Sequence, residues 1–135
     1  YLRALEKSGL GFDPTLVLEI PDPGTCYAVF SEFLKTRPVP DAVFAASDPM
    51  AMQVMKAGKD AGYRIPDDIS VIGFDNLDFS PYLDPPLTTV NQPLYRMGAA
   101  AADRIISLIE GKESEPFVQV MDTELIIRNS TRDRR

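Results

Sequence analysis

The stretch from Ile69 to Phe74 is a short apolar run that ends directly in Asp75 and Asn76. Two similar runs occur earlier in the chain, TLVLEI at 15–20 and AVFAA at 42–46. Their length and their β-branched and aliphatic content predict three β-strands. Each run is almost continuously apolar, which is typical of parallel strands whose two faces are both covered.

Segments with helical spacing separate these predicted strands. The Asp-Pro pairs at 22–23 and 48–49 are typical of an N-cap residue followed by a proline in the first helical turn. We therefore expect helices over 22–36 and 48–61, the second ended by Gly62. Strand, helix, strand, helix, strand with short links predicts an α/β fold, because right-handed crossovers place all three strands parallel in one sheet.

The remaining segments are more varied. A short helix over 1–8 should end at the glycines that follow it. The proline-rich stretch over 76–93 shows no helical period and suits a connection between two lobes. An amphipathic helix is predicted over 94–110, and one or two extended segments over 117–130. That last helix has no sheet nearby in sequence to cover, and the chain starts inside a helical pattern, so we expect a piece of a longer protein.

Composition excludes several classes of protein. The 135 residues, of which 44% are hydrophobic and 25% charged, are ordinary for one globular domain. No apolar run is long enough to cross a membrane. There is no histidine, so the commonest general base and metal ligand is missing, and we expect neither a catalytic set nor a metal or other cofactor. The single cysteine, Cys26, forbids an internal disulfide. The net charge of −6 argues against a broad nucleic-acid surface, and the arginines at 132, 134 and 135 are interpreted as a solvated basic end.

Polar residues stand where the predicted strands end. Ligands of open parallel sheets bind beyond the carboxyl ends of the strands. Those ends carry the candidate ligand-binding residues, which are Pro21 with Asp22, Ser47 with Asp48, and Asp75 with Asn76. Helix capping explains Asp22 and Asp48 equally well, and Asp75 could be a turn residue. The three acids on separate loops could also hold a divalent cation, as in a phospho-receiver domain, although this signal is weak.

Methionines mark a second apolar face on the helix over 48–61. At about 100° per residue, one stripe of apolar side chains should cover the sheet; it contains Met50, Val54, Ala57 and Ala61. Met52 and Met55 lie roughly opposite that stripe. Because a second apolar face on a sheet-flanking helix is one way in which homodimers form, we expect Met52 and Met55 to contact a second copy.

Two stretches resemble the effector-binding region of the LacI/GalR family of bacterial transcription regulators. They are PDAVFAASDPMAMQVMKAGKDAGYRIPDDISVIGFDN at 40–76 and YLDPPLTTVNQPLYRMGAAAADRIISLIEGK at 82–112. The closing ELIIRNST is also similar to the usual final strand of the family. The resemblance is specific from about residue 38 to 131 and looser before it.

The resemblance implies a periplasmic-binding-protein-like (type I) fold, in which two Rossmann-like three-layer lobes hold a small effector, expected to be a sugar, between them. Residues 1–90 would form most of the C-terminal lobe. Residues 91–113 would cross to the N-terminal lobe and supply one of its helices, and 114–135 would return as strands and a basic tail. The DNA-binding region would be absent. The whole protein is expected to be a cytoplasmic homodimer that does not contact membranes.

Individual positions also match family positions. Asp75 matches the aspartate that hydrogen-bonds the effector. Ser47 stands where many members carry asparagine, and Pro21 where an aromatic residue often packs on the ligand, so both depart from the pattern. Met52 and Tyr82 match positions of the dimer interface. These matches favour an effector-sensing portion of a regulator, not an enzyme. A periplasmic sugar-binding protein is the nearest alternative, and an α/β enzyme or receiver domain is a distant one.

Overall fold

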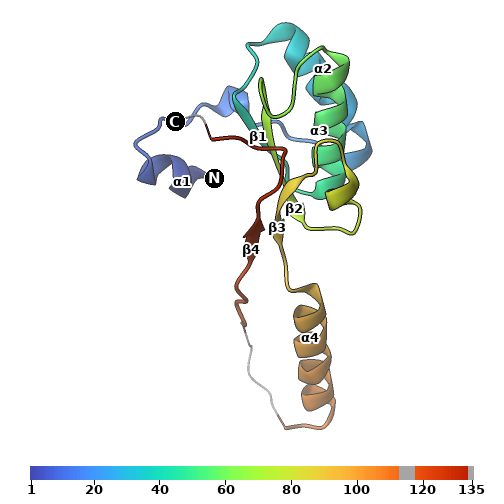
Figure 1. The fold of residues 1–135 in the computed structure, drawn as a ribbon. Helices are drawn as coiled ribbons and strands as arrows, with labels where there is room; N and C mark the ends of the chain where they lie inside the picture. The colour runs from blue at the N-terminus through green and yellow to red at the C-terminus, as the bar shows by residue number, and fades with distance from the viewer. Residues whose placement is uncertain (113–117, 134–135) are drawn as a thin grey trace.

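The structure, a computed structural model, describes residues 1–112 and 118–133. Figure 1 shows a sheet-and-helix body, a short N-terminal helix to its side and a longer helix that extends below it. The helices are α1 (Leu2–Lys7), α2 (Cys26–Thr36), α3 (Asp48–Asp60) and α4 (Leu94–Ile109). The strands are β1 (Ala42–Phe44), β2 (Ser70–Asp75), β3 (Thr88–Asn91) and β4 (Glu124–Ile126). Single 3-10 turns occur at Pro14–Leu16, Pro23–Thr25 and Ser80–Tyr82.

The four strands form one sheet in the order β1-β2-β3-β4. β1, β2 and β3 run parallel, and β4 pairs antiparallel with β3. The helix α3 connects β1 to β2 in sequence and packs on β2. The predicted α/β fold with parallel strands is therefore confirmed, and β4 makes the sheet mixed.

The first predicted strand, over 15–20, does not form. The Asp13 carboxylate accepts hydrogen bonds from the Thr15 amide (2.8 Å) and hydroxyl (2.7 Å), and this starts the turn Pro14–Leu16 instead. The Arg37 guanidinium also donates to the Thr15 carbonyl oxygen at 3.1 Å. An apolar run becomes a strand only when a neighbouring strand takes up its backbone groups, and in the described part of the chain this run pairs with none. Its apolar residues line a cavity of about 350 Å³ beside β1.

The core lies where α3 packs between α2 and β2. Phe30 of α2 is 2% exposed and stacks on Phe33 with 5.8 Å between ring centroids. The capping interpretation of Asp22 is confirmed, because its carboxylate accepts a 2.9 Å hydrogen bond from the Gly24 amide in the turn that leads into α2.

The placement of Met55 in a dimer contact is wrong, because Met55 is only 4% exposed and belongs to the core of the single chain. The residues of α3 that are buried are Asp48, Ala51, Val54, Met55, Ala57 and Gly58. Since α3 packs against α2 as well as β2, its buried arc is wider than one stripe. Ala61, expected in that stripe, instead follows the helix as its C-cap and is exposed.

The helix α4 differs from α2 and α3, both of which contribute buried residues to the core. It forms where the amphipathic pattern predicts a helix, but none of its residues is buried. In Figure 1 it points away from the body, beyond the ends of β3 and β4. Within the described residues no helix combines the length and apolar character that crossing a membrane requires.

The C-terminal segment is tied to the amino ends of β2 and β3. The fully buried Ser130 hydroxyl donates to the Val71 carbonyl oxygen (2.6 Å) and accepts from the Thr88 amide (2.7 Å). Arg132 therefore lies against the body, where its guanidinium is 3.8 Å from the Asp67 carboxylate; Arg134 and Arg135 lie outside the described residues.

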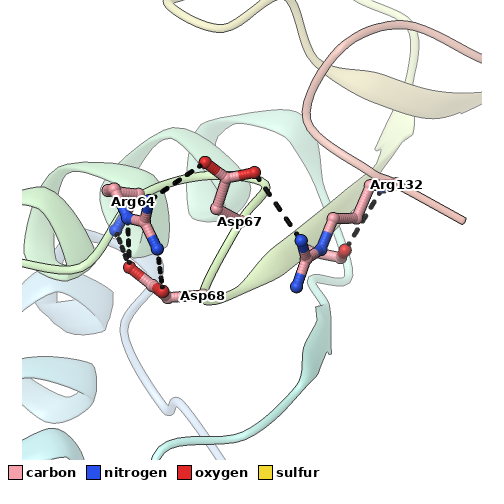
Figure 2. Close-up of polar contacts among 5 residues, drawn as sticks. Arg64, Asp67, Asp68 and Arg132 are labelled. Carbon is pink, nitrogen blue, oxygen red and sulfur yellow. Dashed lines mark hydrogen bonds and ion pairs between the residues drawn. The ribbon is translucent and has the colours of Figure 1, made fainter. Parts of the chain in front are cut away.

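Asp67 belongs to a small charge cluster before β2 (Figure 2). Arg64 donates from Nε and Nη2 to the two carboxylate oxygens of Asp68, at 3.1 and 2.9 Å. The Arg64 backbone amide adds a third hydrogen bond to this carboxylate at 2.8 Å. Hydrogen bonds from Arg64 lower the pKa of Asp68 from its ordinary 3.8 to about 2.

Candidate functional site

The carboxyl ends of the parallel strands meet at one edge of the sheet. Asp75, the last residue of β2, pairs in register with Asn91, the last residue of β3. Phe44 of β1 pairs with Ile72, so the same register continued beyond β1 brings Ser47 level with Asp75. The sequence prediction that Ser47 and Asp75 share this edge agrees with the observed register. We refer to this region as the carboxyl edge, comprising Ser47, Asp75, Asn76, Asn91 and Gln92.

The backbone at the carboxyl edge is held in an unusual conformation. Asp75 has a φ of 111° and Asn76 a φ of 54°, both in the region that favours glycine. Each such non-glycine residue costs on the order of 1–3 kcal/mol and persists only when the surrounding contacts fix it, a situation that is concentrated at functional sites. Strain at the exit of β2 therefore agrees with a binding role for Asp75 and Asn76.

The side chains of Asp75 and Asn76 are half-buried and belong to a polar network. Gln92 Nε2 donates to Asp75 Oδ1 at 2.6 Å. Asn76 Nδ2 donates to Asn91 Oδ1 at 3.1 Å. A carboxylate and amides side by side can exchange hydrogen bonds with the hydroxyl groups of a small polar molecule.

Arg128, which sequence reasoning did not single out, supplies a cation to this network. Its guanidinium donates to Asn76 Oδ1 at 2.8 Å and to the Leu87 carbonyl oxygen at 2.7 Å. Arg128 follows β4, and the antiparallel pairing of β4 with β3 places it level with the start of β3. Its side chain reaches from there to Asn76. Its position in the closing ELIIRNST motif was the one available signal, since nothing local ties it to Asn76.

Asp48 lies deeper than the other candidate residues. Ser47 is the N-cap of α3 and Asp48 is the first helical residue, so the capping interpretation of Asp48 is wrong. The Asp48 side chain is completely buried. Its Oδ2 accepts from the Leu77 amide at 2.9 Å and from the Ser80 hydroxyl at 2.5 Å, and its Oδ1 accepts from the Thr89 hydroxyl at 2.5 Å.

The other candidate residues lie apart from that network. Pro21 is exposed and directly precedes the capping residue Asp22. Asp22, Asp48 and Asp75 do not converge: within 1–112 and 118–133, no three His, Cys, Asp or Glu side chains are grouped so that they could hold a metal ion. This arrangement does not support the receiver-like interpretation of the three acids.

A cavity adjoins the carboxyl edge on the side of α4. It has a volume of about 360 Å³, and its lining includes Gln92, Met97, Arg104 and Met121. Gln92 thus faces both this cavity and the Asp75 carboxylate. The cavity lies between α4 and the segment 119–123, which leads into β4.

An open α/β sheet with strained polar residues at its carboxyl edge is typical of domains that bind small molecules. Comparison with known proteins shows which family of small-molecule-binding domains this chain resembles. The family of periplasmic binding protein-like domains matches residues 1–131. The HTH-type transcriptional repressor PurR of Photobacterium profundum is 42% identical over 103 residues, which cover 76% of this chain and 31% of that protein.

Two solved structures agree with this match. The transcriptional regulator CelR–cellobiose complex superposes with a TM-score of 0.90 at 36% identity, over 96% of this chain and 40% of that one. The lac repressor dimer bound to operator and the anti-inducer ONPF gives a TM-score of 0.80 at 25% identity, over 96% of this chain and 45% of that one. The chain belongs to the periplasmic binding protein-like domain family, in the form found in LacI-type transcription regulators. It spans less than half the length of these three relatives.

Proposed function

We propose that this chain is the effector-sensing and dimerisation portion of a LacI-type transcription regulator. A small molecule, most simply a sugar, binds at the carboxyl edge and changes how the whole cytoplasmic regulator binds DNA. Asp75 is its main hydrogen-bond acceptor, Asn76 and Ser47 lie beside it, and Pro21 lies at the margin of the site. The chain itself carries the sensing step, and reading of DNA belongs to another part of the regulator.

The observation that carries this proposal is the conformation of Asp75. It ends a parallel strand with a φ of 111°, and its half-buried carboxylate lies at the edge where such sheets bind ligands. Carboxylates and amides suit the hydroxyl groups of a sugar, because each accepts or donates several directed hydrogen bonds. The cellobiose complex of CelR, a relative with the same fold, agrees with a sugar.

The proposed lobes follow the division between the body and α4. Residues 1–90 form most of one lobe, and 91–113 carry the chain into the second lobe, to which α4 belongs. Residues 114–135 return to the first lobe; 113–117 and 134–135 lie outside the described residues. The exposed apolar side chains of α4, among them Leu94, Ile105 and Ile109, support its assignment to a second lobe that covers them.

Met52 and Tyr82 are the proposed dimer contacts. Both side chains are exposed, Met52 by 41% and Tyr82 by 87%. Lys59, two helical turns beyond Met52, forms an ion pair with Asp84 at 2.9 Å, which brings the loop of Tyr82 against the Met52 face of α3. One continuous surface containing both residues fits an isologous contact, and the lac repressor relative was solved as a dimer.

The test uses the full-length protein with its operator DNA. Cellobiose, other disaccharides, hexoses and nucleosides are added singly, while thermal melting and operator binding are followed by fluorescence. We expect one compound to raise the melting temperature, because ligand binding stabilises the folded state. The same compound should change operator affinity, because it favours one of two conformations of the dimer. If the full-length protein is monomeric and binds a sugar but does not bind DNA, it is a transport component and the proposal is wrong.

A further inference from the structure

We propose that Asp48 is a positioning residue of the effector site: it fixes the strained turn that presents Asp75 and Asn76, without contacting the effector. This inference rests on the proposed function and adds a role that the carboxyl edge alone does not reveal. Asp48 is an ionisable side chain with no exposed surface, which is unusual unless the charge is fully hydrogen-bonded.

The three hydrogen bonds to Asp48 explain how the charge is held. Leu77 and Ser80 belong to the loop that follows the β2 exit, and Thr89 belongs to β3. Hydrogen bonds to a buried carboxylate are stronger than neutral ones because the donor dipoles face a full charge in a low-dielectric interior. Asp48 also lies in the first turn of α3, where the helix dipole favours a negative charge. No oxygen of this carboxylate is left facing an effector.

The network encloses the strained residues. Asp75 is the last residue of β2, which the sheet fixes, and Asn76 connects it to Leu77, whose amide donates to Asp48. The Asn76 amide also donates to the Thr89 hydroxyl at 3.4 Å, and the same hydroxyl donates to Asp48. Asp48 therefore links α3 to β3 and to the loop after β2. The backbone of Asp75 and Asn76 connects β2 to this loop and is held at both ends.

Gly73 shows that the space around Asp48 is tightly limited. A Cβ atom built on Gly73 would lie 2.2 Å from Asp48 Oδ1, so any side chain at this position would push the carboxylate away. Gly73 has an ordinary backbone conformation, and its requirement is therefore space for Asp48. This packing also leaves no room for a ligand atom beside the carboxylate.

The first experiment needs no ligand. Amide hydrogen exchange of the segment 74–80 is measured in the full-length protein for wild type, Asp48→Ala and the milder Ser80→Ala. Leu34→Ala, a core change on α2, is the matched control for global destabilisation. We expect Asp48→Ala to speed exchange of this segment by about tenfold or more beyond the control, and Ser80→Ala to do so by less. Unchanged exchange in both Asp48→Ala and Ser80→Ala would overturn the positioning role.

The second experiment measures affinity for the compound that the operator screen identifies. Asp48→Ala should weaken binding by about tenfold, whereas Leu34→Ala should leave it within about twofold. The affinity of Asp48→Asn should stay close to that of wild type. Its amide oxygen can still accept from Leu77 and Ser80, and its NH₂ group can donate to the Thr89 hydroxyl.

The affinity of Asp48→Asn separates positioning from direct contact. If Asp48 contacted the effector as an acceptor, Asp48→Asn would lose affinity as Asp48→Ala does while Ser80→Ala bound normally, and the inference would fail. If no compound in the screen binds, the proposed function fails, and the exchange measurement still decides whether Asp48 holds the turn.

Discussion

The helices α3 and α4 carry the same kind of amphipathic pattern but meet different surroundings. α3 buries its apolar side between α2 and β2 and contributes Ala51, Val54 and Met55 to the core. α4 buries none of its residues and extends from the body (Figure 1). The period of apolar residues predicts that a helix has a face to bury, but not what buries it. That information lies in parts of the chain that are distant in sequence.

Among substitutions in the body and in α4, a core substitution in the body is expected to change the free energy of unfolding most. Phe30→Ala should lower the free energy of unfolding by about 3–5 kcal/mol, because it removes a fully buried ring and leaves a cavity against Phe33. Urea denaturation followed by circular dichroism measures this loss. A loss below about 1 kcal/mol would mean that the contact between α2 and α3 does not hold the body together.

Two glycines allow a matched comparison of the same substitution. Gly73→Ala should destabilise the protein by about 1–3 kcal/mol through overpacking against Asp48 and Leu87. Gly98→Ala, in the middle of α4 where an added Cβ meets no atom within 4 Å, should stabilise the protein by about 0.5–1 kcal/mol through helix propensity. The same denaturation experiment gives both values, and effects of equal sign would contradict the distinction between the two regions.

The charge cluster of the body should make its stability depend on pH (Figure 2). The folded-state pKa of Asp68 is lowered from 3.8 to about 2, so its stabilising contribution is complete above the ordinary pKa and is lost as the pH falls through the folded value. The difference in unfolding free energy between wild type and Asp68→Asn should therefore shrink as the pH falls from 4 to 2. Urea titrations at several pH values in this range measure that difference. A difference that stays constant with pH would show that the Arg64–Asp68 pair does not make the stability depend on pH.

The smallest effect is expected on α4. Ile105 is 57% exposed, so Ile105→Ala should change the free energy of unfolding of this chain by no more than about 0.5 kcal/mol. A loss above about 1.5 kcal/mol at any protein concentration would show that α4 packs against the body or against a second copy.

Local sequence predicts those elements of the fold that local interactions determine. The runs before Ser47 and Asn76 form β1 and β2, and the periodic segment over 94–110 forms α4 as expected. The run over 15–20 has equal strand propensity but remains unpaired in the described residues, because a strand depends on a neighbour that propensity does not reveal. The apolar pattern places Met55 on the wrong side of α3, because packing against α2 widens the buried face of that helix.

In the candidate site too, some residues are predictable from local sequence and others depend on contacts that are distant in sequence. Asp75 is predictable because an apolar parallel strand must end at the ligand edge of its sheet. The roles of Asp48 and Arg128 are not, because Asp48 meets Thr89 and Arg128 meets Asn76 only through the completed sheet. Direct ligand contacts by Ser47 and Pro21 remain predictions.

The central claim is that the Asp75 carboxylate contacts the effector, and the ratio of two dissociation constants tests it most directly. Calorimetric titration of the full-length protein with the compound found in the operator screen compares Asp75→Asn with Asp78→Asn, a nearby exposed acid that loses the same charge. We expect Asp75→Asn to weaken binding by about tenfold or more, as for a lost hydrogen bond to a charged group, and Asp78→Asn to bind within about twofold of wild type. Equal affinities for the two variants and wild type would contradict the account.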